Sequence, residues 1–142
     1  MRTAFFIAVV ALCAVRTLAQ LTNVISTSSL SGTKYEFTLS FDELDRGPSW
    51  PATAECPPLS PRKAVVAGRE FLGKLTGNKI DWRLSTITLH KYTEGGDPSR
   101  DKWAYKVRFL DAGVSNGPVR SFEVVVYMTG KVIEPHVSRG KS

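Results

Sequence analysis

The sequence predicts an α+β fold in which one helix packs on an antiparallel sheet of about four strands, in the order β-α-β-β-β. Three observations support this prediction. Residues 61–75 repeat small and apolar side chains at spacings of three and four, as one face of a helix does. Four other segments alternate apolar and polar residues or are rich in β-branched ones, which is typical of strands. The connections between the last three strands are short, so these strands are expected to pair with their neighbours.

Residues 1–19 have the layout of a secretory signal peptide, and we expect cleavage after Ala19. The stretch MRTAFFIAVVALCAVRTLA contains an early arginine, an apolar run from Ala4 to Val15 and small residues before the cleavage point. The run is shorter than the roughly 20 residues that a membrane-spanning helix needs, and no later segment approaches that length. We therefore expect an exported protein, periplasmic or extracellular, without a membrane span.

The chain that remains after cleavage is long enough for one domain with a buried core, at roughly 120 residues. We assign a leader at 20–33, a single α+β domain at 34–137 and a tail at 138–142. The leader is rich in Ser and Thr and carries no charge, so it is expected to be flexible, with a short first strand as the alternative. Cys56 is the one cysteine left after cleavage. Its expected state is burial as a small hydrophobe, and a free thiol or an intermolecular disulfide are the alternatives.

The first strand of the domain is YEFTLSF, whose apolar face contains Tyr35, Phe37, Leu39 and Phe41. Residues 42–61 contain five prolines, which exclude a regular helix or a central strand across this stretch. We therefore expect a long Pro-rich surface loop at 42–60, which Trp50 pins by burying its ring.

The helix is expected to begin at Ser60 and Pro61, because serine is a good N-cap and proline suits the first turn. Gly68 costs about 1 kcal/mol relative to Ala inside a helix, so we expect it to allow a close approach to a strand. Gly77 with Asn78 is the expected end of the helix. The face that packs on the sheet is expected to contain Ala64, Ala67, Gly68, Phe71, Leu72 and Leu75.

Three strand segments close the chain. WRLSTITLHKY shifts its alternation between Leu84 and Ile87, which indicates a bulge or a strand that is covered on both faces. KWAYKVRFL and SFEVVVYM alternate cleanly, with their aromatic and aliphatic residues on the inner face. Glu123 is expected to face outward and to pair with Lys106 or Arg108 on the neighbouring strand.

The last of these strands runs into Thr-Gly-Lys, which raises the alternative of a phosphate-binding loop. Such a loop needs G-x-x-x-x-G-K-[ST], but Val125 stands five residues before Gly130, and Val132 follows Lys131. We expect Gly130 to supply a positive φ in a tight turn, with Lys131 in solvent beside it.

In the segments PRKAVVAGREFL, WAYKVRF and FEVVVYMTGKVI the sequence resembles the PepSY and PepSY-like group of small exported domains. The last segment matches the typical end of that family's repeat, which is a strand, a Thr-Gly-Lys turn and a short second strand. The resemblance covers Ser60 to Glu134. It implies a fold close to that of the cystatins and a non-enzymatic domain that in some members restrains peptidases. It transfers no catalytic residue.

The residues indicate no catalytic group, no cofactor and no metal. Cys56 with His90 or His136 would form a thiol–imidazole pair, but no local signature accompanies either histidine, so surface imidazoles are expected. Acidic residues cluster at 42–45 and 94–101 without the spacing of a calcium loop, so they are expected to be solvated.

The candidate binding surface is a basic stripe on the open face of the sheet. We expect it to contain Lys102, Lys106 and Arg108 with Arg83, and Trp50 completes the set of candidate binding residues. A protein partner or an anionic envelope polymer is expected there, and nucleic acid is not, because the chain is exported. The alternative is an ordinary polar outer face whose cations pair with a carboxylate.

The sequence therefore predicts a small exported non-enzymatic binding domain of PepSY-like type, which restrains a peptidase or binds an envelope component. Peptidase restraint would use an exposed sheet edge or the 42–60 loop, because an edge strand accepts an extended peptide by main-chain pairing. The alternative function is a small cone-shaped α+β enzyme or ligand-binding protein that uses a pocket near Cys56.

Overall fold

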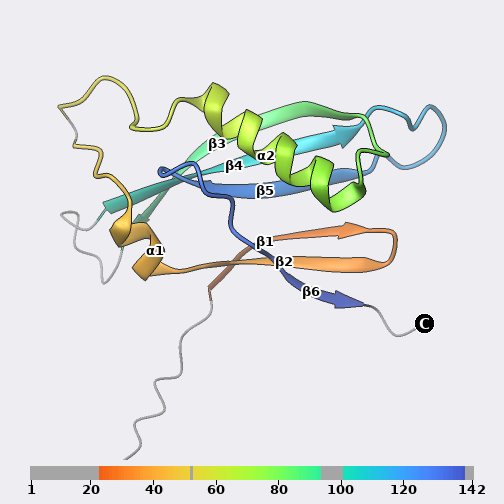
Figure 1. The fold of residues 1–142 in the computed structure, drawn as a ribbon, viewed down its shortest axis with the longest axis horizontal. Helices are drawn as coiled ribbons and strands as arrows, with labels where there is room; N and C mark the ends of the chain where they lie inside the picture. The colour runs from red at the N-terminus through yellow and green to blue at the C-terminus, as the bar shows by residue number, and fades with distance from the viewer. Residues whose placement is uncertain (1–22, 52, 94–100, 140–142) are drawn as a thin grey trace, which may run out of the picture.

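The computed structural model describes residues 23–51, 53–93 and 101–139, and over these ranges the chain forms two antiparallel sheets of three strands each (Figure 1). The first sheet has the order β1-β2-β6, with β1 at Asn23–Leu30, β2 at Thr33–Leu39 and β6 at His136–Arg139. The second has the order β3-β4-β5, with β3 at Trp82–Thr93, β4 at Asp101–Asp111 and β5 at Ser121–Tyr127.

The α+β class is therefore confirmed, but two smaller sheets stand where one sheet of about four strands was expected. The expected signal peptide at 1–19 lies outside the described residues.

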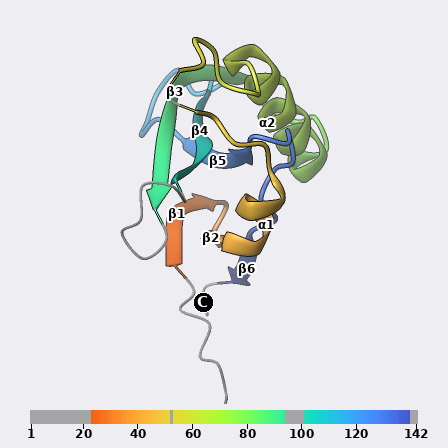
Figure 2. The same cartoon turned by 90° about the vertical axis from the view of Figure 1, so that its left-hand side faces the viewer.

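Helix α2, Pro61–Thr76, covers one face of the second sheet and contacts all three of its strands (Figures 1 and 2). Both ends lie where the sequence predicts them. Ser60 Oγ accepts a hydrogen bond from the Lys63 N–H at 3.4 Å, and Gly77 ends the helix in the left-handed region with φ +60°. The predicted inner face is confirmed, since Ala64, Gly68 and Leu72 are buried and the other three members pack half-buried against the core.

The segment 20–33, which was expected to be a flexible leader, contains β1 and the turn that joins it to β2. Ser31 and Gly32 both have positive φ, at 50° and 77°, as the tightest hairpin turns require. Ser26, Ser28 and Leu30 alternate with exposed residues and are buried, so β1 has the period of a half-buried strand although two of its inward residues are serines. The short-strand alternative is the correct one.

At the other end of the chain, β6 pairs with β2 in the register Thr33↔Arg139 to Glu36↔His136. The ordered domain therefore extends past the expected boundary at 137 and takes in the first residues of the expected tail.

The 42–60 segment begins with a short helix, α1 at Phe41–Arg46, which the prediction of a continuous loop missed. The first proline of this stretch is Pro48, so nothing before it forbids helical backbone. Ser40 caps the helix by accepting from the Glu43 N–H at 3.4 Å, and Leu44 is buried. The prolines begin only after this helix has ended, so they exclude helical backbone from the later part of the segment alone.

The rest of this segment is a surface loop, as expected. Trp50 is half-buried, its ring centroid lies 5.0 Å from that of Trp103 on β4, and its Nε1–H donates to the Ala54 carbonyl at 3.1 Å. Cys56 is exposed, which corrects the expectation that it is buried. The apolar residue of this loop that is buried in the core is Leu59.

The strands of the second sheet follow the predicted pattern. The register of β3 against β4 shifts between Leu84 and Thr86, which confirms the bulge. Gly130 has φ +87° and its N–H donates to the Tyr127 carbonyl at 2.8 Å, so Thr-Gly-Lys is a turn as expected. Lys131 is exposed and forms an ion pair with Glu43 at 3.2 Å.

Candidate functional site

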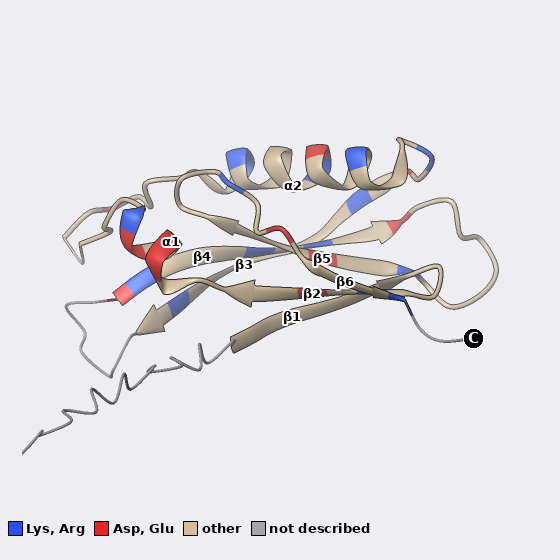
Figure 3. Ribbon diagram, turned by 60° about the horizontal axis from the view of Figure 1, so that its bottom comes forward, with Lys and Arg blue, Asp and Glu red and all other residues tan. Residues whose placement is uncertain are grey.

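The predicted basic residues lie on β3 and β4, whose ribbons carry blue segments in Figure 3, and the strand register places their side chains on the face of the second sheet opposite α2. Lys102, Lys106 and Arg108 alternate along β4 with the residues that pack under the helix, and Arg83 of β3 pairs with Leu110 on this same face. The sequence therefore predicts correctly which residues share the face. Whether these basic side chains can bind a ligand depends on which other residues contact them.

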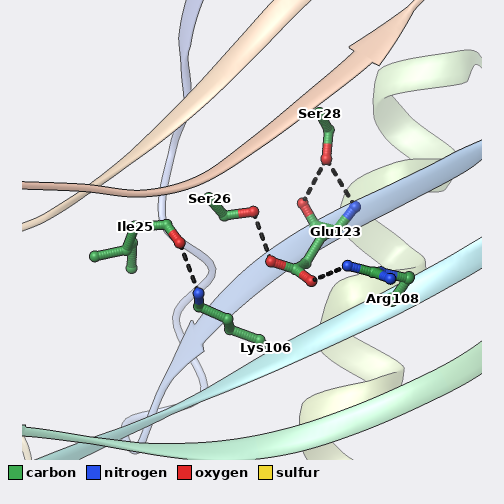
Figure 4. Close-up of polar contacts among 6 residues, drawn as sticks. All are labelled: Ile25, Ser26, Ser28, Lys106, Arg108 and Glu123. Carbon is green, nitrogen blue, oxygen red and sulfur yellow. Dashed lines mark hydrogen bonds and ion pairs between the residues drawn. The ribbon is translucent and has the colours of Figure 1, made fainter.

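Lys106 is held by the first sheet (Figure 4). Its Nζ donates to the Ile25 carbonyl at 2.6 Å. The pairing of β1 with β2 shifts between Val24 and Ser26, so Ile25 lies in a bulge. A bulged residue is left out of the ladder, and its carbonyl is therefore free to accept from the lysine.

Glu123 of β5 is the centre of the same cluster (Figure 4). Its carboxylate accepts from Ser26 Oγ at 2.7 Å and from Arg108 Nη2 at 3.2 Å. Ser28 Oγ accepts from the Glu123 N–H at 2.8 Å and donates to the Glu123 carbonyl at 3.2 Å. The expected pairing of Glu123 with a β4 cation is confirmed for Arg108.

These contacts join the two sheets, and we call the residues that make them the seam: Ile25, Ser26, Ser28, Lys106, Arg108 and Glu123. At Ser28 a hydroxyl takes the position that a main-chain ladder partner would take beside β5. The seam uses two of the four basic residues for structure.

The other predicted binding residues lie apart from one another. Lys102 is 15% exposed, and its Nζ lies 3.9 Å from an Asp45 carboxylate oxygen of α1. Arg83 is 75% exposed, and its Nε lies 3.9 Å from Asp81. Trp50 packs on Trp103, whose side chain belongs to the α2 side of the sheet. The structure thus does not bring the five predicted residues into one surface, and Arg83 is the most exposed of the cations.

Two titratable residues of β3 share the outer face with the seam. Burial lowers the pKa of His90 below its ordinary value; the positive charge of Lys106 acts in the same direction and Glu123 opposes it. Burial raises the pKa of Tyr92 to about 12, with a further contribution from Glu123. Both side chains are therefore held in their neutral forms near neutral pH, as expected of a covered sheet face.

The residues considered for catalysis or metal binding are not assembled into a site in the described part of the chain. Cys56 lies exposed in the loop before α2, whereas His90 belongs to β3 and His136 to β6. Within residues 23–51, 53–93 and 101–139, no three His, Cys, Asp or Glu side chains group as metal ligands. Most of the acidic cluster at 94–101 falls outside the described residues. In the described ranges no helix is long and apolar enough to cross a membrane.

A feature that sequence reasoning did not single out is the outer edge of β3. Among the described residues, β3 has a strand partner on one side only, at the end of the β3-β4-β5 order. The opposite edge of that sheet is closed. Ser28 binds the main chain of Glu123, the Val125 carbonyl accepts from Ile133 N–H at 2.9 Å, and Tyr127 N–H donates to the Lys131 carbonyl at 2.9 Å.

The same hydrogen bonds determine which main-chain groups point outward on β3. In an antiparallel ladder the main-chain groups of successive residues point alternately to one side and to the other. The main-chain groups of Glu123, Val125 and Tyr127 point away from β4, so the main-chain groups of the residues between them bond β4. The partners of those residues on β4 use their main-chain groups for β5. The main-chain groups of Ala104, Lys106 and Arg108 therefore point toward β3. Those three residues pair with His90, Thr88 and Thr86.

It follows that Ile87, Leu89 and Lys91 direct their N–H and C=O groups away from the sheet. The side chains of Ile87 and Leu89 are half-buried and pack against the core, so they anchor this part of the strand to the sheet. An edge of this kind is ready to pair with another extended segment. The absence of proline and of acidic residues from WRLSTITLHKYT was the one signal in the sequence.

A cavity of about 500 Å³ continues this edge at the N-terminal end of β3. Three consecutive residues of the strand, Trp82, Arg83 and Leu84, form one side of it. The other lining residues come from the end of α2 and the loop after it: Arg69, Gly73, Asn78, Ile80 and Asp81. Two further cavities lie beside the seam and between α2 and the turn at Gly130, and Cys56 lines none of these three cavities of the described residues.

Comparisons with known protein families, with curated proteins and with solved structures found no match for this chain.

Proposed function

We propose that this chain is a small exported binding domain, non-enzymatic and PepSY-like, which binds an extended segment of a protein partner along the outer edge of β3. The observation that carries the proposal is the outward direction of the N–H and C=O groups of Ile87, Leu89 and Lys91, on an edge without a strand partner among the residues that the structure describes. Main-chain pairing at a free edge supplies affinity, and neighbouring side chains supply selectivity. Restraint of a peptidase is the form of this function that the PepSY resemblance suggests.

The edge favours this function over binding of an anionic polymer. A polymer site needs several free cations on one face, but Lys106 and Arg108 have acceptors within the chain, and Lys102 is mostly buried beside Asp45. The β3 edge has no such internal partner among the described residues.

The test compares Lys91→Pro with Lys91→Ala in the chain from Gln20 onward. Both variants lose the lysine side chain, but only proline removes the N–H, and that N–H points away from β4. A partner is first captured from the secreted and envelope fractions of the source organism and purified. We expect it to bind Lys91→Ala nearly as well as the unmodified chain and Lys91→Pro at least tenfold more weakly.

Hydrogen exchange locates the contact independently of any substitution. The amides of Ile87, Leu89 and Lys91 are expected to exchange rapidly in the free protein and slowly in the complex, while those of Thr86 and Thr88 are slow in both. Equal binding by the two Lys91 variants, or protection confined to another surface, would remove the basis for the proposal.

A further inference from the structure

The cavity at Trp82 indicates what kind of segment the edge accepts. We infer that the bound segment runs antiparallel to β3 and ends in a free C-terminal carboxylate, which lies in this cavity beside Arg69 and Arg83. The inference rests on the proposed function and adds the direction and the terminal chemistry of the ligand.

The position of the cavity along β3 is the basis for placing the end of the segment there. Its lining contains Trp82, Arg83 and Leu84 in succession, so it lies alongside the first residues of β3. The bulge between Leu84 and Thr86 interrupts regular pairing at the same place. Beyond Trp82, Ile80 and Asp81 of the connection from α2 also line the cavity. A segment paired along Lys91 to Ile87 that continues toward Trp82 therefore reaches this cavity.

The charges of the cavity select a negative group. The lining contains two arginines, Arg69 and Arg83, and one acid, Asp81, whose carboxylate oxygen is 3.9 Å from Arg83 Nε. Within the described ranges Arg69 makes no ion pair. Further along the edge, β3 carries His90 and Lys91 and no acidic residue. Guanidinium groups bind carboxylates with two parallel hydrogen bonds, which makes the end of a peptide chain a suitable ligand.

Trp82 supplies a second, independent observation. The residue is 5% exposed and lines the cavity, and its Nε1–H is buried without an acceptor among the described residues. An indole N–H can only donate, and leaving it unpaired in the interior is costly. The nitrogen is also inaccessible to water, so a ligand oxygen in the cavity can accept from it only after the Trp82 side chain shifts.

The direction of the segment follows from the charges of its two termini. An antiparallel segment has its C-terminus at the Trp82 end of β3, where Arg69 and Arg83 attract it. A parallel segment would bring its terminal ammonium to the same two guanidinium groups, and like charges repel. The distance from Lys91 to Trp82 corresponds to a segment of about ten residues at roughly 3.3 Å per residue.

The experiment uses a synthetic library of ten-residue peptides, prepared once with free C-terminal carboxyl groups and once with C-terminal amides. Peptides that protect the β3 amides from hydrogen exchange are selected, and their dissociation constants are measured for both forms. We expect amidation to weaken binding at least tenfold, because a charge-assisted contact to the carboxylate is lost.

The matched variants are Arg69→Gln and Arg62→Gln, which both remove an exposed arginine from α2. Arg62 lines a different cavity, so its substitution is expected to leave both peptide forms unaffected. Arg69→Gln is expected to weaken the carboxylate form to the level of the amide and to leave the amide unchanged. A spin label on the peptide N-terminus is expected to broaden the amide signals of Lys91 and Thr93 and not those near Trp82.

The outcomes separate this inference from the function on which it rests. Peptides that protect β3 but bind equally well as acids and amides would overturn the carboxylate and leave edge binding standing. Broadening near Trp82 would overturn the antiparallel direction. If no peptide in either library protects β3, edge binding itself fails, and the inference fails with it.

Discussion

At the scale of single residues, Gly68 shows most directly how the sequence encodes packing. A Cβ atom at this position would lie 2.8 Å from Val124 Cγ2 and 3.1 Å from Phe109 Cε2. Those two side chains come from neighbouring strands, so the missing side chain sets how closely α2 approaches the sheet. A mid-helix glycine on an apolar face was sufficient to predict this contact from the sequence.

We expect Gly68→Ala to destabilise the protein. Alanine gains about 1 kcal/mol in helix propensity, but forcing a methyl group into a filled core typically costs about 1–3 kcal/mol. If the cost lies in the upper half of that range, the free energy of unfolding falls by about 1–2 kcal/mol. Urea unfolding measures this change. Val66→Ala, on the exposed side of the same helix, is the control and should change stability by less than about 0.5 kcal/mol. A more stable Gly68→Ala protein would show that the helix can move away from the sheet.

His90 makes stability depend on pH. The unfolded chain takes up a proton on this imidazole near pH 6.5, whereas the folded chain, in which the pKa is lowered by burial and by Lys106, takes it up only at lower pH. Protons therefore favour the unfolded state, and this contribution to stability is lost as the pH falls below about 6.5.

Urea midpoints measured between pH 8 and pH 5 test this expectation. The His90→Gln variant should lose less stability across this range than the unmodified chain. His136→Gln is the control for loss of an exposed imidazole. Parallel curves for His90→Gln and the unmodified chain would show that His90 titrates alike in both states.

At the scale of elements, regular patterns were predicted and local exceptions were not. Helix α2 was predictable with both of its ends because spacing, N-cap and C-cap residues agree. The bulge in β3 was predictable because the alternation of side chains shifts there. Helix α1 was missed because the prolines that follow it dominate the composition of its segment. Strand β1 was read as a leader because its inward residues include serines, whose burial depends on partners far away in the chain.

Ser28 is the most informative of these serines. It is 6% exposed, and its hydroxyl satisfies both the N–H and the C=O of Glu123. Replacing Ser28 with alanine would leave two main-chain groups of β5 without partners, at a cost of about 1–3 kcal/mol. Ser29→Ala, its exposed neighbour on β1, removes the same hydroxyl without such a role.

Urea unfolding of the two variants measures the difference. We expect Ser28→Ala to be clearly less stable than Ser29→Ala. Equal midpoints would mean that water replaces the Ser28 hydroxyl, and that the seam contributes little to joining the sheets.

At the scale of the whole molecule, the predicted class is correct and the arrangement of strands is not. Side-chain periodicity shows that a segment is a strand and which of its faces is buried, but not which strand lies beside it. The first sheet combines the beginning and the end of the domain, β1-β2 with β6, and no local pattern reports such a pairing. For the same reason the basic residues were assigned correctly to one face, while the seam that holds Lys106 and Arg108 could not be foreseen.

The candidate site was only partly accessible to sequence reasoning for a related reason. An exposed sheet edge was named as a route for a partner, and β3 is such an edge. The position of β3 at the outside of its sheet depends on which strands lie beside it, and the sequence of β3 itself does not reveal this. The cavity beside it joins Arg69 to Arg83 across the α2–β3 connection, a proximity that the spacing of the residues does not reveal.

The seam also constrains the order in which the chain acquires its structure. Ser26 and Ser28 contact Glu123 across 97 and 95 positions of the sequence, so the β1-β2 hairpin cannot dock until β5 is in place. A chain that is synthesised from its N-terminus contains the hairpin first and the matching strand nearly last. Contacts of such long sequence separation give a high contact order, which is associated with slow folding. Until β5 has been synthesised, the hairpin therefore lacks the strand on which it docks.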